Sequence, residues 1–204
     1  MYFKWHILPS TSVSVIHAPL GMDRNDNLPF FLRDKLRLHR HQQQLKSLLL
    51  EKENLPETLR YDPHGRPYLT PGHHISLSHS GEAAAMAVSA GARTGIDIQE
   101  FSPKVLHVLP RIASPQETET ALRDETGQTA HYVWSAKEAV YKAAGIRGLS
   151  LRDDIRLDFY GGLPYRARVN ENGREIRYRL YPYRLNEYFL VTAVEEKPEE
   201  IRLR

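Results

Sequence analysis

The dipeptide Asn172-Gly173 limits what the second half of the chain can fold into. Asn-Gly favours a tight two-residue turn, because both residues tolerate the positive φ angles that such a turn requires. Runs that alternate apolar and polar residues flank it, so an antiparallel hairpin is predicted. Two further runs of this kind extend the prediction to a small sheet. Its expected strands are at about 154–160, 164–170, 174–181 and 187–195.

Two helices are expected ahead of this sheet. In the segment 129–144, small apolar residues recur at i, i+3, i+4 and i+7, which predicts one buried helical face. The residues are Ala136, Ala139, Val140 and Ala143. Gly145 follows as a natural end. A polar helix at about 114–126 opens with Ser114 and Glu117, the spacing of a capping box.

The first half contains comparable elements. A leucine stripe predicts a helix at 29–53, and strands are expected at 13–18, 75–80 and 94–100. The segment 83–90 fits either a helix or a buried strand, and the turn after it favours a strand in a hairpin. We therefore predict an α+β fold of two halves, 1–100 and 101–204, each with a helix packed on a small antiparallel sheet.

Composition narrows the function classes. The chain has 204 residues, no cysteine and no apolar run of membrane-spanning length, and it does not begin like a secretory signal. The absence of cysteine excludes disulfides and thiolate metal sites and fits a cytoplasmic protein. The net charge of +3 is spread among acidic residues, whereas a nucleic-acid binder usually gathers its basic residues into a stripe.

The string GIDI at 95–98 contains the first candidate for chemistry. Ile96 and Ile98 point to one side of a strand, so Asp97 and Gln99 share the other. A carboxylate and an amide oxygen on one face form part of an oxygen cage suited to Mg²⁺. The alternative is an edge-strand aspartate that faces water.

The string WSAKEAVYK at 134–142 contains the second candidate. Glu138 and Lys142 lie one helical turn apart, roughly opposite the alanine face, with Lys137 beside Glu138. An acid among cations could hold phosphates around a metal-bound carboxylate. The alternative is a solvated surface pair that contributes a few tenths of a kcal/mol.

The string SLSHS at 76–80 brings hydroxyls and an imidazole to a strand end. Turn chemistry is the plain interpretation. A Ser–His–Asp hydrolase is a sharper one, but no G-x-S-x-G elbow surrounds any serine. His73, His74 and His79 lack the spacing of a zinc motif.

Together, HGRPYL, SLSHS, GIDI and WSAKEAVYKA resemble the 4′-phosphopantetheinyl transferases, across about residues 61–145. The combination of G-[IV]-D with a following W-x-x-K-E-x-x-x-K is specific. The likeness is to the larger, two-half branch of the surfactin synthetase activating type. It implies a pseudo-twofold, monomeric molecule with its site between the halves.

The resemblance also assigns roles to residues. Asp97 and Glu138 match the Mg²⁺ carboxylates, and Gln99 falls where many members have a second acid. Lys142 matches the lysine that reaches the coenzyme A pyrophosphate. The remaining matches to coenzyme A-binding positions are Ser78, His79, Lys137, Arg66, Lys46 and Ser47. Candidates for the 3′-phosphate are Arg33, Lys35 and Arg40.

The implied reaction moves the phosphopantetheine arm of coenzyme A onto a serine of an apo acyl or peptidyl carrier protein. It releases adenosine 3′,5′-bisphosphate and uses Mg²⁺, which Mn²⁺ could replace. Glu138 or a metal-bound water is expected to take the serine proton, with His79 as the other candidate base. The alternative function is a coenzyme A or nucleotide-binding module without transfer activity, which Gln99 in place of an acid favours.

Overall fold

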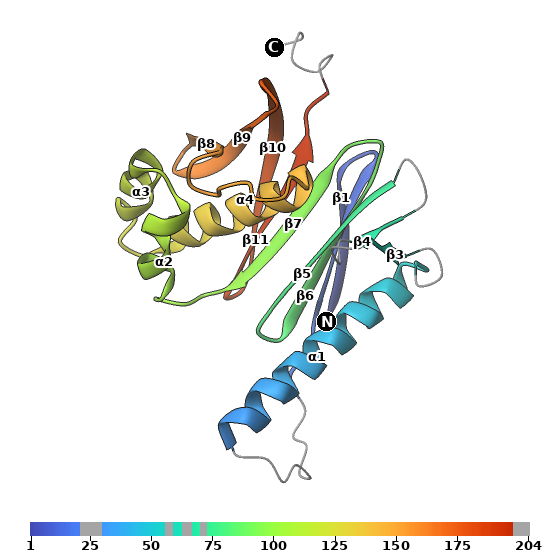
Figure 1. Cartoon of the computed structure of the whole chain (residues 1–204). Helices are drawn as coiled ribbons and strands as arrows, with labels where there is room; N and C mark the ends of the chain where they lie inside the picture. Colours follow the sequence, from blue (N-terminus) through green and yellow to red (C-terminus); the bar gives the residue numbers. More distant parts are fainter. Residues whose placement is uncertain (21–29, 56–58, 63–66, 70–72, 198–204) are drawn as a thin grey trace.

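Two antiparallel sheets organise the chain in the computed structural model (Figure 1). The structure describes residues 1–20, 30–55, 59–62, 67–69 and 73–197, with only the backbone of 30–34. The four-stranded sheet has the order β1 (Tyr2–Leu8), β2 (Thr11–His17), β6 (Ala83–Ala90), β5 (His73–Ser80). The five-stranded sheet has the order β7 (Thr94–Glu100), β11 (Tyr188–Glu195), β10 (Arg174–Leu185), β9 (Leu163–Glu171), β8 (Ile155–Tyr160). A two-stranded ribbon pairs β3 (Arg60–Tyr61) with β4 (Pro67–Tyr68).

Helices cover the outer faces of the sheets. The helix α1 (Phe30–Lys52) packs on the four-stranded sheet through Leu45 and Leu49. The helix α4 (Gln128–Ala144) packs on the five-stranded sheet through its alanine face, with α2 (Val105–Ile112) and α3 (Pro115–Leu122) beside it. The inner faces meet in a third cluster that joins β2 and β6 to β7 and β11. Figure 1 shows α1 and α4 lying along different sheets.

The two sheets repeat one order of connections. In the first, β2 precedes α1 and pairs with the last strand, β6, which pairs with β5. In the second, β7 precedes α4 and pairs with the last strand, β11, which pairs with β10. The described chain is therefore a mixed α/β fold in which each sheet has its own helix.

Most of the expected elements are present. The helices expected at 129–144 and 29–53 are α4 and α1, and Ser114 and Glu117 form the expected capping box. The segment 83–90 is the strand β6. Asn172 and Gly173 have φ angles of 52° and 81°, as the turn requires. The helix α2, which contains Pro110, was not expected.

The pairing of β7 concerns the predicted halves 1–100 and 101–204, which stay a prediction. The strand β7 was assigned to the first half, but it pairs with β11 of the C-terminal sheet. The sheets divide between β6 and β7 because β7 finds its backbone partner in a strand almost a hundred residues later, which local sequence does not reveal.

Candidate active site

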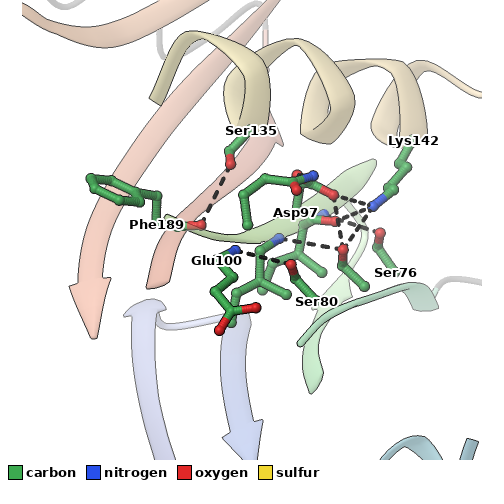
Figure 2. Close-up of polar contacts among 11 residues, drawn as sticks. Ser76, Ser80, Asp97, Glu100, Ser135, Lys142 and Phe189 are labelled. Carbon is green, nitrogen blue, oxygen red and sulfur yellow. Dashed lines mark hydrogen bonds and ion pairs between the residues drawn. The ribbon is translucent and has the colours of Figure 1, made fainter. Parts of the chain in front are cut away.

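Asp97 lies at the centre of a polar cluster between α4 and the edge strands β5 and β7 (Figure 2). Its side chain is buried, at 3% residue exposure, so it is not an edge-strand aspartate that faces water. Its Oδ1 accepts hydrogen bonds from Lys142 Nζ at 2.7 Å and from Ser78 Oγ at 2.8 Å. Its Oδ2 accepts one from Gln99 Nε2 at 2.9 Å. Asp97 and Gln99 therefore share a face, as the sequence predicts.

Lys142 connects the residues of this cluster through hydrogen bonds and an ion pair. Besides its ion pair with Asp97, its ammonium donates to Ser78 Oγ and to the carbonyl of Ile96, each at 3.1 Å. Its ion-pair partner is Asp97 of the sheet, not Glu138 of its own helix. Lys142 therefore forms a contact between α4 and β7 rather than a solvated surface pair with Glu138.

Glu138 lies in the electrostatic range of Asp97, and no described residue donates a hydrogen bond to its carboxylate. Burial raises the pKa of the Glu138 carboxyl, and the neighbouring Asp97 charge raises it further, while Lys142 acts in the opposite direction. No hydrogen bond or ion pair links the Glu138 side chain to another residue of the described chain. Two carboxylates with one lysine between them leave an excess of negative charge in a half-buried place.

Gly95 explains how α4 approaches β7 so closely. A Cβ at this position would lie 2.0 Å from the carbonyl oxygen of Ala139 and 2.6 Å from the backbone nitrogen of Ala143. Only glycine leaves room for the helix backbone here. The alanine face of α4 contributes by keeping its own side chains short, and this proximity lets the lysine of the helix reach Asp97.

Ser78 reaches the cluster from β5 of the other sheet, and His79 follows it in the same strand. Ser78 is buried and contacts both Asp97 and Lys142. Burial lowers the pKa of His79, and the positive charges of Lys46 and Lys142 lower it further. Both effects favour the neutral form of the His79 imidazole, which is in the electrostatic range of cations from α1 and α4.

Lys137 does not fit the coenzyme A-binding role that the resemblance implied. Its side chain is fully buried, its Nζ lies 2.7 Å from Glu117 Oε2, and it donates to the carbonyl of Ile155 at 2.6 Å. Burial lowers its pKa. Lys137 and Glu138 are adjacent in the helix and so point in different directions, and the ammonium of Lys137 is enclosed by α3 and β8.

The other assigned positions lie at the margin or beyond it. Burial lowers the pKa of Lys46 on α1, and its positive charge lowers the pKa of His79. Ser47 is exposed, and its hydroxyl donates to the carbonyl of Gln43 in its own helix. Lys35 and Arg40 are exposed on α1. Arg66 and the Arg33 side chain lie outside the described residues.

A pocket of about 540 Å³ opens beside the cluster, and sequence reasoning had missed several of its residues. Lys142 and Ser76 of the cluster are among its lining residues. The pocket continues past the end of α4, where Gly145 turns the chain with a φ of 64°. Its described lining is Asp62, Pro67, Ile75, Ser76, Leu77, Tyr141, Lys142, Gly145, Ile146 and Arg147. Arg147 lies beyond the motif that drew attention to the helix, so no pattern pointed to it.

Metal ligands were also sought across the described residues. No group of three or more His, Cys, Asp or Glu side chains is placed there to hold an ion, so His73, His74 and His79 do not form one. The pair Asp97 and Glu138 is a smaller donor set. Such a pair suits a cation that takes only one or two carboxylates from the protein and its other oxygens from water and phosphate.

Of two comparisons with known proteins, one gives a match. No curated protein matches the chain. No helix in the described part of the chain is long and apolar enough to cross a membrane. Residues 93–193, which contain Asp97, Glu138 and Lys142, match the sequence model of the 4′-phosphopantetheinyl transferase superfamily, and this match supports a function of the phosphopantetheinyl transferase type.

Proposed function

We propose that this chain is a Mg²⁺-dependent 4′-phosphopantetheinyl transferase of the two-half branch. It would transfer the phosphopantetheine arm of coenzyme A to a serine of an apo acyl or peptidyl carrier protein. The observation that carries the proposal is the meeting of Asp97 with Lys142, with Glu138 close by, inside the segment that matches the superfamily. The repeated order of strands around α1 and α4 supports the pseudo-twofold arrangement.

The donor set fits a divalent cation. Glu138 has a raised pKa because burial and Asp97 both disfavour its charge, and a cation between the carboxylates would relieve both effects. Asp97 and Glu138 would hold Mg²⁺, with Gln99 as a neutral or water-mediated neighbour. When bound, the ion would neutralise charge on the pyrophosphate of coenzyme A.

The residues of the chain have distinct tasks in the transfer. The serine Oγ of the carrier forms a bond to the phosphorus that bears pantetheine, and the bond from that phosphorus to the adenosine bisphosphate oxygen breaks. Lys142 would stabilise the oxygen that leaves, and a Glu138 carboxylate oxygen would accept the serine proton. Neutral His79 would donate one N–H to a phosphate oxygen.

The pocket beside Lys142 is the proposed place of coenzyme A. It is lined by the apolar residues Ile75, Leu77 and Ile146 together with the cations Lys142 and Arg147. This combination suits a ligand that has both an organic arm and phosphates. We further propose that the protein is a cytoplasmic monomer, because the chain has no cysteine and carries both halves itself.

The test is a transfer assay with apo carrier proteins and coenzyme A, with and without Mg²⁺. Mass spectrometry should find a carrier that gains one phosphopantetheine only when the metal is present. Asp97→Ala should abolish transfer, and Lys142→Ala should lower turnover on the order of a hundredfold if its contact forms mainly in the transition state. Arg123→Ala, which removes an exposed cation on α3, should keep full activity.

The alternative is a coenzyme A-binding module. It is favoured by Gln99, whose amide donates to Asp97 where a second acid would add a metal ligand. Calorimetric binding of coenzyme A, combined with no mass gain for any carrier in the panel, would support the module and exclude the transferase for those carriers.

A further inference from the structure

Serine side chains join the two sheets at the site. The edge strands β5 and β7 belong to different sheets, and every second residue at the end of β5 is a serine. The hydroxyl oxygens of Ser76, Ser78 and Ser80 accept hydrogen bonds from backbone N–H groups of β7, and Figure 2 draws these contacts. The donors are Ile96, Ile98 and Glu100, at 3.0, 3.3 and 2.9 Å.

The match of the two strands has a simple geometric cause. An edge strand leaves the N–H of every second residue without a partner in its own sheet. Side chains on one face of a strand recur with the same period of two. Serines at alternate positions of β5 therefore meet successive free N–H groups of β7. We call these three contacts the serine joint.

The middle contact of the serine joint is part of the site. A hydroxyl offers one donor and two acceptor positions. Ser78 uses all three: it donates to Asp97, and it accepts from the N–H of Ile98 and from Lys142. Among the described residues, the hydroxyls of Ser76 and Ser80 form hydrogen bonds with β7 alone, at the N–H groups of Ile96 and Glu100. The outer serines thus hold the strands in register around the central one.

We propose that Ser76 and Ser80 are positioning residues. Their hydroxyls set the register and separation of β5 and β7, and so hold Ser78 of the N-terminal half against Asp97 and Lys142. The consequence for catalysis rests on the proposed transferase function, whereas the serine joint itself does not. The two parts can therefore be tested separately.

The first test is amide hydrogen exchange measured by NMR on the full chain, without ligand. In the wild type, the amides of Ile96 and Glu100 should be protected although β7 is an edge strand. Ser76→Ala should raise the exchange rate of Ile96, and Ser80→Ala that of Glu100, each by about fivefold or more. Ser89→Ala is the matched control, because it removes a buried serine hydrogen bond to Thr11 elsewhere in the same sheet.

The second test is steady-state transfer. Combined Ser76→Ala and Ser80→Ala should lower kcat about tenfold or more at saturating coenzyme A and Mg²⁺, because reacting groups are displaced. The KM for coenzyme A should change much less for Ser80→Ala alone, because Ser80 does not line the pocket proposed for coenzyme A. Ser80→Thr retains the hydroxyl and should keep both the kcat and the protection of Glu100, which a role in packing alone would not explain. Ser89→Ala should leave kcat unchanged.

The outcomes separate the two claims. Rapid exchange of Ile96 and Glu100 in the wild type would overturn the serine joint, whatever the activity. If the amides of Ile96 and Glu100 are protected in the wild type and the double variant has the same kcat as Ser89→Ala, the positioning role is overturned. If the wild type transfers nothing to any carrier, the proposed function and the positioning role both fail, and amide exchange still decides the serine joint.

Discussion

Gly95 is the residue whose size matters most to the site. Gly95 lies within β7, and its importance is the close contact with the α4 backbone. Gly95→Ala should reduce the free energy of unfolding by about 3 kcal/mol, at the upper end of overpacking effects, because backbone has to move. Urea denaturation measures this loss.

Gly173→Ala is the comparison for Gly95→Ala. A Cβ at Gly173 meets open space, but the residue has a φ of 81°, so only conformational strain of about 1 kcal/mol is expected. Equal losses for the two variants would show that the helix does not press on Gly95.

Gln99 is the residue at which the charge of the site can be changed. Gln99→Glu places a third carboxylate beside Asp97 and removes the amide donor that now neutralises part of its charge. We expect a lower Tm in EDTA and a larger rise in Tm on addition of Mg²⁺ than for the wild type, because the ion binds only the folded state. Differential scanning fluorimetry measures both. If Mg²⁺ changes the Tm of neither protein, the metal assignment is contradicted.

At the scale of elements, the buried pair of Lys137 and Glu117 connects α4, α3 and β8. Glu117 also accepts from the backbone of Ser114, as part of the cap of α3, and from the backbone of Leu157 in β8. One carboxylate therefore satisfies three donors from three elements. The pair therefore has a structural role. Lys137 lies on the same helix as Glu138 and Lys142, so the motif included it although its ammonium points away from the site.

Breaking this pair should be costly. Glu117→Gln leaves the Lys137 ammonium buried without a counter-charge, and we expect a loss of about 3–5 kcal/mol in urea denaturation. Combining it with Lys137→Met should recover part of the loss, since both charges are then gone. The exposed pair Glu119 and Arg123 on α3 is the control, where Glu119→Gln should lose at most about 0.5 kcal/mol. Similar losses for the two glutamine variants would contradict the structural role.

At the scale of the whole molecule, the two sheets share a core. Val13 and Val15 of β2 and alanines of β6 pack against Ile96, Ile98 and Leu190 of the other sheet. Cutting between the sheets would expose this apolar surface on both pieces. The sheets are therefore expected to unfold as one cooperative unit rather than as separate domains.

Expressing the pieces 1–92 and 93–204 separately tests this expectation. Neither should show a cooperative thermal transition by circular dichroism, and both should bind a hydrophobic dye, while the full chain melts once. A piece that folds alone with dispersed amide resonances would show that its half is an independent domain.

The sequence by itself determined the local elements and the identity of the central residues. Alternation, Asn-Gly and the alanine stripe predicted the strands, the hairpin and α4, because these signals act between residues close in the chain. The motif likeness singled out Asp97, Glu138 and Lys142. Only the tertiary structure decided that Lys137 is enclosed, that β7 joins the C-terminal sheet, and that serines of β5 bond to β7. Each of these depends on which distant segment lies opposite a side chain, and that is set by packing of the whole chain.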